Sequence, residues 1–373
     1  MTVARAATPV GIIGMGNVSG VYLKTLRAFP TLEVVVCADI DLERARAQGS
    51  RFGIPRAVPV AELLADPSPE LVINLTVPAA HADIGAAVLQ AGKALYNEKP
   101  LAIERAAGRA LLDAAAGAGV RIGGAPDTFL GAPQQTARRV IDSGAIGELT
   151  GVAIFSTREG PERWHPNPEF FFEHGAGPLF DLGVYHLTTL VSLLGPVAAV
   201  SASARIAPTP RVIGSGPQAG ISFAARTPTH VSGSLELASG LPGTIMTSWD
   251  VAGSELPWIE IYGSKGTLSL PDPAEFNGDL RLRRGGEKHW SVVPAVPAFA
   301  EAGRGLGAAE MVEAMRAGRP HRATGERAFH VLDIMCALYE SSEQKRQVEL
   351  QSTCERPEPL PLGWPDLGQD VVA

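Results

Sequence analysis

A glycine-rich turn near the N-terminus is the first pattern in the sequence that predicts a chemistry. Residues 14–20 read Gly-Met-Gly-Asn-Val-Ser-Gly and follow an apolar run that is typical of a strand. Gly14 allows a tight turn, and Gly16 lets the backbone approach a pyrophosphate at the start of a helix. Ser19 fills the third position of the G-x-G-x-x-G pattern with a small side chain. The expected cofactor contacts are Gly14, Met15, Gly16, Asn17 and Val18.

A carboxylate follows at the spacing that a bound ribose requires. Asp39 ends the next expected strand, 19 residues beyond Gly20, and Ile40 comes after it. Such a carboxylate accepts a hydrogen bond from the ribose 2′-hydroxyl and repels the 2′-phosphate of NADP. We therefore expect Asp39 and Ile40 to favour NAD over NADP, with Arg44 and Arg46 as the argument for NADP. Folds with this turn also bind S-adenosylmethionine, so the turn alone leaves the reaction open.

A lysine at the end of a later expected strand is the candidate for proton transfer. Lys99 lies in the run Tyr-Asn-Glu-Lys-Pro of residues 96–100, at the edge of the sheet where ligands of open parallel sheets bind. Desolvation beside an apolar ring would lower the pKa of its ammonium group, which suits general acid–base chemistry. The alternative is a solvated lysine at the start of a loop.

A parallel sheet has to position these residues, and the first 125 residues predict one. Short β-branched runs alternate with alanine-rich helical stretches, as in βαβ units with helices on both faces of a sheet. The expected strands are 10–13, 32–38, 71–75, 94–96 and 120–123, and the expected helices are 18–29, 42–52, 81–91 and 103–118. We predict an α/β fold, with a doubly wound Rossmann domain over residues 1–128.

The remaining chain predicts a second domain of a different class. Strands follow one another with few helices between them, which indicates a large, mainly antiparallel sheet in an α+β domain over residues 129–350. The expected strands are 151–157, 198–206, 229–237, 243–251, 258–262, 267–270 and 280–283, and the expected helices are 179–194 and 325–346. Residues 207–220 are expected to form a surface loop, and the proline-rich tail 351–373 an extended arm.

The order of these motifs resembles that of the Gfo/Idh/MocA oxidoreductases. The motifs are the glycine turn, Thr76-Val77-Pro78 with His81, Gly92-Lys93, Glu98-Lys99-Pro100, and the runs at 145–148, 175–183 and 262–266. The resemblance covers nearly the whole chain to about residue 350. It implies an NAD(P) domain, a second domain whose open sheet commonly forms homodimers or homotetramers, and hydride transfer at a hydroxyl-bearing carbon of a sugar or polyol.

The resemblance also implies the roles of individual residues. By position it implies cofactor contacts from Thr76, Pro78, His81, Glu98 and Lys99, and catalytic roles for Lys99, Asp181 and Tyr185. Tyr185 stands where many relatives have a histidine, and this version resembles glucose–fructose oxidoreductase and dihydrodiol dehydrogenase. If residues 181–186 are helical, Tyr185 shares a face with Asp181 whereas His186 points elsewhere.

The substrate pocket is the part of the site that the motifs define least. The resemblance implies that Lys99, Asp181 and Tyr185 line it. We also expect Asp127, Trp164 and His165 there, the aromatic pair because sugars stack on aromatic rings. Trp164 and His165 are equally compatible with an ordinary loop anchor. Relatives often carry an arginine-rich segment where residues 125–129 read Ala-Pro-Asp-Thr-Phe, so that part of the pocket is not transferred.

Composition narrows the function classes. The 32 Lys and Arg against 39 Asp and Glu leave a net charge of −7, which argues against a nucleic-acid partner. Three cysteines without C-x-x-C spacing favour a reducing cytoplasm over a disulfide framework. No H-E-x-x-H pattern occurs, so we expect no metal. The apolar stretch 182–200 contains His186, Gly195 and Pro196, which favours a buried helix and strand over a membrane span.

The preferred hypothesis is an NAD(P)-dependent dehydrogenase for a sugar, polyol or similar cyclic alcohol. The alcohol would lie between the nicotinamide and the second domain and lose its proton to the pair of Tyr185 and Lys99. Two alternatives use the same fold: an NAD-dependent glycosidase, and a non-catalytic regulator that binds NAD or sugar. Net NADH formation from free sugars separates the three, because a glycosidase recycles its cofactor and a regulator turns nothing over.

Overall fold

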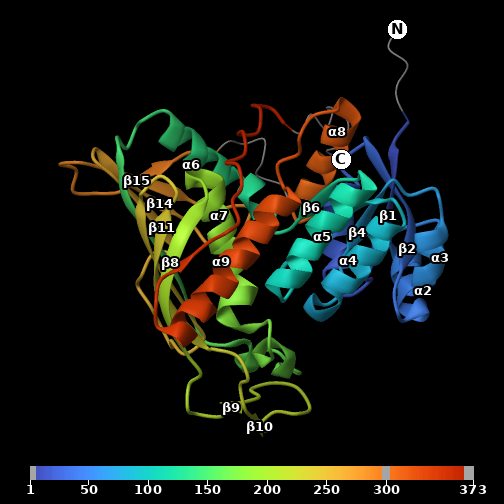
Figure 1. The fold of residues 1–373 in the computed structure, drawn as a ribbon, viewed down its shortest axis with the longest axis horizontal. Helices are drawn as coiled ribbons and strands as arrows, with labels where there is room; N and C mark the ends of the chain where they lie inside the picture. Colours follow the sequence, from blue (N-terminus) through green and yellow to red (C-terminus); the bar gives the residue numbers. More distant parts are fainter. Residues whose placement is uncertain (1–5, 296–302, 365–373) are drawn as a thin grey trace. The chain divides into compact units, whose positions relative to one another are not determined.

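The computed structural model describes residues 6–295 and 303–364, and their contacts divide the chain into two compact units (Figure 1). Of the described residues, the first unit holds 6–130, 303–329 and 360–364, and the second holds 131–295 and 330–359. The first boundary lies close to the expected one at residue 128. The later boundaries differ from the expected domain limits, because a C-terminal stretch returns to pack with the first unit.

The first unit is built on a parallel sheet, which confirms the expected fold class. Its described strands run in the order β3-β2-β1-β4-β5-β6. They are β1 (Thr8–Ile13), β2 (Leu32–Ala38), β3 (Arg56–Val58), β4 (Leu71–Asn74), β5 (Ala94–Asn97) and β6 (Ile122–Gly124). Every residue of β4 and β5 is buried, as expected for strands covered on both faces. The order reverses between β1 and β4, which is the position where open α/β sheets bind ligands.

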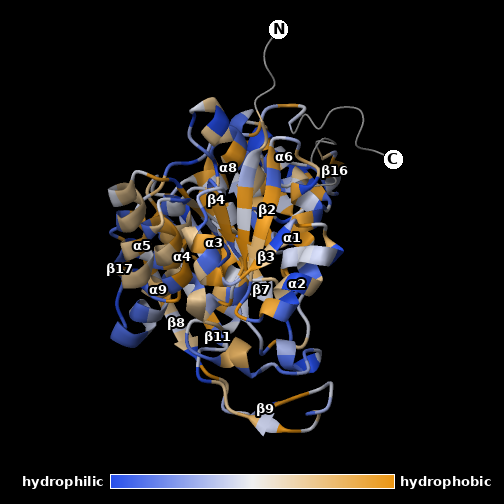
Figure 2. Cartoon of the chain, turned by 90° about the vertical axis from the view of Figure 1, so that its right-hand side faces the viewer, coloured by the Kyte–Doolittle hydropathy of each residue, from blue (hydrophilic) through white to orange (hydrophobic). Residues whose placement is uncertain are grey.

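Helices flank this sheet, and two of them were not expected from the sequence. The helices are α1 (Ser19–Leu26), α2 (Leu42–Arg51), α3 (Val60–Ala65), α4 (His81–Gln90), α5 (Arg105–Ala118) and α8 (Leu306–Ala317). The sequence analysis missed α3 and α8, together with the short strand β3. Figure 2 shows β2 largely in the orange of hydrophobic residues, whereas the neighbouring α2 carries hydrophilic residues. The Asp41 side chain caps α2 by accepting a hydrogen bond from the Arg44 amide.

The second unit contains a large mixed sheet, as expected. Its described strands run in the order β16-β15-β14-β13-β7-β12-β11-β8-β17. They are β7 (Leu149–Thr157), β8 (Val197–Arg205), β11 (His230–Leu237), β12 (Pro242–Ser248), β13 (Ile259–Gly263), β14 (Gly266–Leu270), β15 (Leu280–Arg284), β16 (Ser291–Val293) and β17 (Val348–Glu349). Neighbours are antiparallel except β7 and β12, which are parallel. Residues 264–265 form the hairpin turn between β13 and β14.

The helices of the second unit include a turn of unusual geometry. They are α6 (Ala132–Asp142), α7 (Val184–Leu194) and most of α9 (Gly325–Gln344), which begins in the first unit. The expected helix 179–194 starts with a π-helical turn over Leu179–Gly183 and becomes α-helical only at Val184. The helix α7 is buried along almost its whole length and leads into β8, which confirms the interpretation of the apolar stretch. Within the described residues, no helix is long and apolar enough to cross a membrane.

Two segments are more ordered than the sequence suggested. The stretch 207–220, expected as a surface loop, contains β9 (Arg211–Val212), which pairs with β10 (Ser222–Phe223), and Ile213 is buried. The described part of the tail, expected as an extended arm, is packed: Leu360 is fully buried in the first unit. In the second unit the Arg356 guanidinium binds the Asp142 carboxylate at 2.7 Å. Buried side chains and ion pairs therefore fix segments whose prolines and glycines predicted irregular chain.

Candidate active site

The glycine turn between β1 and α1 has the shape that a dinucleotide requires. Gly14 has φ +97°, and a Cβ atom there would lie 2.5–2.7 Å from backbone atoms of Leu75 and Thr76, so that only glycine fits. A Cβ at Gly16 would meet nothing within 4 Å, which leaves open space for a phosphate at the start of α1. The Ser19 hydroxyl donates to the Gly16 carbonyl at 2.7 Å, and this bond satisfies the polar group at the third position of the motif.

Asp39 is tied to this turn rather than standing alone at the end of β2. Its Oδ2 accepts a hydrogen bond from the Met15 amide at 2.7 Å, and its Oδ1 accepts one from the Asp41 amide at 2.9 Å. The Arg44 guanidinium, which is half exposed, lies 3.6 Å from Oδ1. Ile40 is 98% exposed. A carboxylate fixed in this way presents negative charge beside the turn, and its remaining lone pairs can accept a hydrogen bond from a ribose hydroxyl.

A buried amide network joins the ends of β4 and β5. The Asn74 side-chain amide donates to Asn97 Oδ1 at 2.7 Å, and Asn74 Oδ1 accepts from the Thr76 hydroxyl at 2.7 Å. The ring nitrogens of His81 face the carbonyls of Pro100, at 2.7 Å, and Thr76, at 3.0 Å. Burial lowers the pKa of the His81 imidazole, so the neutral ring donates to one carbonyl only. Pro78, the remaining expected contact in this segment, is exposed. The network fixes the backbone of two loops that follow the sheet.

Lys99 is the second residue after β5, and Glu98 fixes its backbone amide. Glu98 Oε2 accepts a hydrogen bond from the Lys99 amide at 2.7 Å, while Oε1 accepts one from the Tyr22 hydroxyl of α1 at 2.9 Å. Glu98 and Tyr22 are buried, whereas Lys99 is partly exposed. Burial, reinforced by the neighbouring Glu98 carboxylate, holds the pKa of Tyr22 well above its usual value, so its hydroxyl remains a donor. Glu98 was expected to contact the cofactor. Both of its carboxylate oxygens accept hydrogen bonds from protein groups instead.

Asp127, expected to bind substrate, is committed to the start of α8. One of its carboxyl oxygens accepts hydrogen bonds from the amides of Gly305, at 2.8 Å, and Gly307, at 2.9 Å. The residue is 1% exposed, and desolvation raises its pKa to about 6 even though the two amides lower it. A carboxylate is favourable at a helix N-terminus. In this structure that oxygen fixes the start of α8, so Asp127 has a structural contact beside the substrate role expected for it.

Asp181 and Tyr185 belong to the second unit, on either side of the change from π-helical to α-helical backbone. Asp181 is partly exposed on the π-helical turn, and Tyr185 is 3% exposed in the first turn of α7. His186 is buried, with Nδ1 3.0 Å from the Leu182 carbonyl. Burial lowers the pKa of its imidazole to about 4, so His186 is neutral at physiological pH. π-Helical turns inside α-helices are frequent at functional sites.

Trp164 and His165 lie in an exposed aromatic cluster of the second unit. Trp164 is 65% exposed and its ring centroid lies 5.4 Å from that of His165 and 6.3 Å from that of Phe171. Phe170, which is 54% exposed, is 5.4 Å from His165. Flat apolar rings next to solvent suit the apolar face of a sugar. The geometry is compatible with the expected role of this loop.

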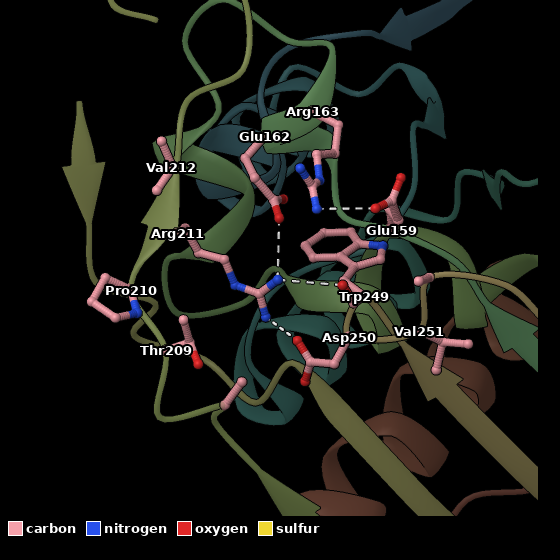
Figure 3. A pocket seen from close by; sticks show the side chains of 12 residues that line it. Glu159, Glu162, Arg163, Thr209, Pro210, Arg211, Val212, Trp249, Asp250 and Val251 are labelled. Atoms are coloured by element: carbon pink, nitrogen blue, oxygen red, sulfur yellow. Dashed lines mark hydrogen bonds and ion pairs between the residues drawn. The ribbon is translucent and has the colours of Figure 1, made fainter. Parts of the chain in front are cut away.

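A cavity of about 410 Å³ lies in the same unit, among η3 (Pro161–Arg163), β9 and the end of β12 (Figure 3). Arg211 projects into its centre and donates to Glu162 Oε1 at 3.1 Å and to the Trp249 carbonyl at 3.3 Å. It also pairs with Asp250. At the rim, Arg163 pairs with Glu159 at 3.0 Å.

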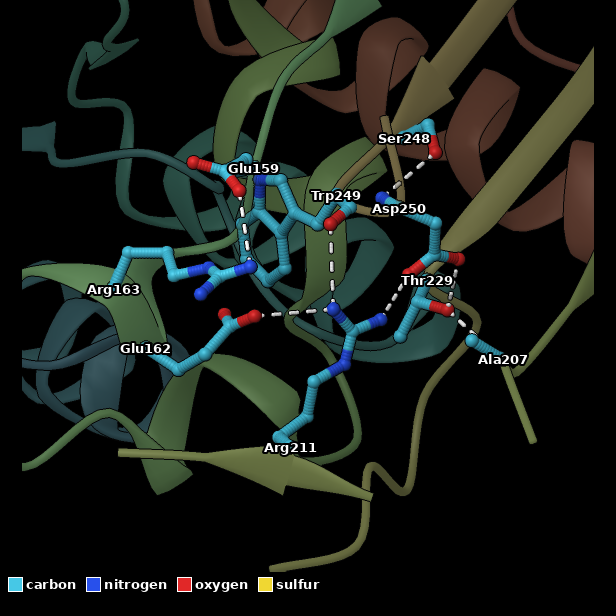
Figure 4. A network of polar contacts seen from close by, with 9 residues as sticks. All are labelled: Glu159, Glu162, Arg163, Ala207, Arg211, Thr229, Ser248, Trp249 and Asp250. Carbon is cyan, nitrogen blue, oxygen red and sulfur yellow. Dashed lines mark hydrogen bonds and ion pairs between the residues drawn. The ribbon is translucent and has the colours of Figure 1, made fainter. Parts of the chain in front are cut away.

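The contacts of Arg211 belong to a larger network that explains the order of the segment around β9 (Figure 4). Asp250 Oδ2 accepts from the Thr229 hydroxyl at 2.7 Å, and that hydroxyl in turn accepts from the Ala207 amide at 2.9 Å. Buried ion pairs depend on both partners, because a lone buried charge is strongly destabilising. Arg211 therefore anchors the segment to the sheet.

Several of these residues were missed by the sequence analysis. Tyr22, Asn74 and Asn97 lie within or next to the expected motifs, but polar residues inside a strand or helix carry no periodic signal. Arg211 and Glu162 are far apart in sequence, and only the fold brings them together. Among the described residues, no group of three or more His, Cys, Asp or Glu side chains is arranged to hold a metal ion.

Comparison with known proteins agrees with this arrangement. Residues 8–124 match the model of an oxidoreductase family with an NAD-binding Rossmann fold, and residues 134–269 match the GFO/IDH/MocA C-terminal domain. The chain is 27% identical over 368 residues to D-apiose dehydrogenase from Paraburkholderia graminis, across 91% of this chain and 89% of that one. It is 25% identical over 362 residues to the NADP-dependent scyllo-inositol 2-dehydrogenase IolW from Bacillus subtilis, across 92% and 96%.

A solved structure shows the same fold. Levoglucosan dehydrogenase in complex with NADH and L-sorbose superposes with a TM-score of 0.80 at 20% identity, across 93% of this chain and all of that one. The Rossmann unit, the mixed sheet and these matches together define an oxidoreductase with two units. The chain belongs to the GFO/IDH/MocA family. It is a dehydrogenase of the kind that acts on CH–OH groups.

Proposed function

We propose that the protein is an NAD-dependent dehydrogenase that transfers a hydride between nicotinamide and a hydroxyl-bearing carbon of a sugar or polyol. The observation that carries the proposal is Lys99 at the end of β5, with its amide fixed by Glu98. The family relationship supports the substrate class, because named relatives act on D-apiose and scyllo-inositol. When bound, NAD accepts the hydride; the chain has to bind the alcohol and take up its proton.

In this proposal each candidate residue has a task that suits its surroundings. Lys99, which is partly exposed, takes part in removing the hydroxyl proton. Tyr185 shares that task, since its buried hydroxyl is shielded from water. Asp181 accepts a hydrogen bond from a substrate hydroxyl and orients the ring. Trp164 and His165 provide an aromatic surface for the sugar.

The cofactor preference follows from the charge beside the glycine turn. Asp39 is held by the Met15 amide and cannot turn away from the position where a 2′-phosphate would lie. Arg44 acts in the opposite direction, because its half-exposed guanidinium lies only 3.6 Å from that carboxylate and would attract a phosphate. We assign NAD as the preferred cofactor.

Assembly and location complete the proposal. Phe155, Met246 and Tyr262 are partly exposed on one face of the mixed sheet, in neighbouring strands. This face supports a homodimer or homotetramer through the sheet. Three cysteines in 373 residues favour the cytoplasm.

The experiment that tests the function is NADH formation by the purified full chain. Aldoses, inositols, sugar acids and sugar anhydrides are supplied with NAD and, separately, with NADP. We expect net NADH formation with at least one free sugar or polyol, and a rate at least about a hundredfold lower with the Lys99→Met variant. Sugar release from a glycoside without net NADH would replace the proposal by a glycosidase. Cofactor and sugar binding without any turnover would replace it by a regulator.

A further inference from the structure

We infer that Tyr22 is a positioning residue for Lys99, and that it acts through the carboxylate of Glu98. The inference rests on the proposed function of Lys99. Tyr22 does not approach Lys99 in sequence, and no motif assigns it a role. The contact arises because α1, which follows the glycine turn, packs against the end of β5.

The Glu98 carboxylate forms a bridge between two elements. The Tyr22 hydroxyl donates to Oε1 at 2.9 Å, and the Lys99 amide donates to Oε2 at 2.7 Å. The Glu98 amide itself donates to the Asn74 carbonyl at 2.9 Å, in continuation of the ladder between β4 and β5. The Glu98 backbone is therefore fixed by the sheet, and the direction of its carboxylate is fixed by Tyr22.

Burial makes the Glu98 carboxylate depend on the Tyr22 hydroxyl for a hydrogen bond. Tyr22 has no exposed surface, and Glu98 is 7% exposed. Water cannot replace the phenol as a donor to Oε1, and a buried carboxylate that loses a hydrogen bond is strongly destabilised. Without the phenol, the carboxylate would turn to find another donor and would weaken its bond to the Lys99 amide.

The bridge also connects the Lys99 backbone to the cofactor turn. Tyr22 lies one helical turn beyond the start of α1, and Ser19 at that start binds the Gly16 carbonyl. One side-chain pair therefore connects the helix that follows the glycine turn to the Lys99 amide.

The test compares Tyr22→Phe with a matched control, Tyr96→Phe. Both tyrosines are buried in the first unit, but the Tyr96 hydroxyl lies near Asp127 and Gly307 rather than against the Glu98 carboxylate. We expect Tyr22→Phe to lower kcat about tenfold or more, because small displacements of a catalytic group are costly. KM and the Kd of NAD should stay within about twofold, the pattern of an interaction that matters only in the transition state.

A second measurement does not need activity. Amide hydrogen exchange of the full chain, read on peptides that cover residues 97–101, reports on the Lys99 amide directly. We expect faster exchange there in Tyr22→Phe than in wild type, with β1 and β4 unchanged. In Tyr96→Phe these peptides should exchange as in wild type.

The outcomes separate this inference from the proposed function. If wild type turns over no sugar or polyol while exchange at 97–101 still rises in Tyr22→Phe, the function is wrong but the bridge stands. If wild type is active and Tyr22→Phe keeps both its kcat and its exchange pattern, Tyr22 does not position Lys99. Equal losses of kcat in the two variants would reduce Tyr22 to a packing residue.

Discussion

At the scale of single residues, the candidate site divides into groups proposed to face a ligand and groups that hold them. Lys99 and Asp181 are partly exposed, whereas Glu98, Asn74 and Asp127 are buried and bound to protein atoms. Residue type alone does not separate these classes, because each group includes carboxylates. Exposure separates these particular residues, since Lys99 and Asp181 keep accessible surface whereas Glu98, Asn74 and Asp127 do not.

Replacing Lys99 with Met tests the central residue. Met keeps the length and apolar body of the side chain and removes the ammonium group. We expect the Kd of NAD to change little and kcat to fall at least about a hundredfold, the usual scale for a general acid–base group. Lys24→Met, at an exposed position of α1, is the matched control and should keep its kcat. A Lys99→Met enzyme with near-normal kcat would make Lys99 a solvated loop residue.

Cofactor choice is also decided at the scale of residues. The Kd of NAD should be lower than that of NADP when both are measured at one ionic strength, because Asp39 repels the 2′-phosphate. Arg44→Ala should widen the difference, since it removes the cation 3.6 Å from that carboxylate. Arg46→Ala is the control, because Arg46 pairs with Glu43 instead. Tighter binding of NADP by wild type would show that Arg44 outweighs Asp39.

Sequence patterns singled out the residues proposed to face a ligand, but not the residues that support them. The glycine turn is recognisable because a tight backbone approach restricts its residue types. Lys99 is recognisable because it lies where an expected strand ends. Tyr22 is a buried aromatic in an amphipathic helix, and such a residue usually means core packing. Its functional contact depends on a carboxylate 76 positions away, which only the folded chain brings within 2.9 Å.

At the scale of elements, the π-helical turn before α7 determines which side chains share a face. A π-helix closes its hydrogen bonds at i+5 and turns less per residue than an α-helix. Two of the four steps from Asp181 to Tyr185 lie in this wider geometry. The smaller rotation brings Tyr185 closer to the direction of Asp181 than a regular helix would. An ideal helix already favours a shared face, and the π-helical turn brings the two directions closer still.

Replacing Tyr185 and His186 one at a time tests which of the two side chains faces the reacting hydroxyl. Tyr185→Phe should lower kcat strongly and alter its pH profile, because it removes the hydroxyl proposed to take part in proton transfer. His186→Ala should leave the pH profile of kcat unchanged, since this imidazole is buried, neutral and bound to the Leu182 carbonyl. Loss of turnover in His186→Ala with a nearly silent Tyr185→Phe would assign the proton transfer to His186.

Elements with a strong period were predictable, and elements stabilised by buried polar groups were not. The strand β2 matches the expected range 32–38 in full. The helix α6 was missed because buried Gln134, Gln135 and Arg138 break its apolar pattern. The helix α8 buries Glu310, whose Oε1 is 2.5 Å from Arg319 and 2.6 Å from Arg322. A charge reads as solvent-facing until the partners that neutralise it are known.

At the scale of the whole molecule, residues near the C-terminus pack against segments that are distant in the sequence. In the first unit, the Trp364 ring lies 5.9 Å from that of Phe29 and its indole donates to Glu313. In the second unit, Ser352 binds both His330 of α9 and Asp333. The domain limits expected from the sequence missed these returns, because linear patterns show where strands lie but not which unit a connecting segment joins.

The His330 contacts predict how stability depends on pH. His330 Nε2 accepts a hydrogen bond from the Val197 amide at 3.0 Å, so the proton must lie on Nδ1, 2.8 Å from the Ser352 hydroxyl. That hydroxyl donates to Asp333 at 2.5 Å. Protonation of Nε2 would set two N–H groups against each other. Burial accordingly lowers the pKa of His330 to about 4, although Asp333 opposes the shift.

The sign of the effect follows from proton counting. Because the folded pKa of about 4 lies below the unfolded value of 6.5, the unfolded chain binds more protons between these pH values. Stability is therefore fully present above about pH 6.5 and falls as the pH drops toward 4. His186 and His321, with pKa values of about 4, act in the same direction. Asp127, with a raised pKa of about 6, opposes them.

Thermal unfolding of wild type and His330→Gln measures this contribution. We expect the Tm of wild type to fall between about pH 7 and about pH 5, and the Tm of His330→Gln to fall less over the same interval. The variant should be less stable at neutral pH, because the Val197 amide loses the imidazole nitrogen that accepts its hydrogen bond. His289→Gln, at an exposed position, is the control and should keep the wild-type slope. An unchanged slope in His330→Gln would mean that His330 does not report the acid sensitivity of the fold.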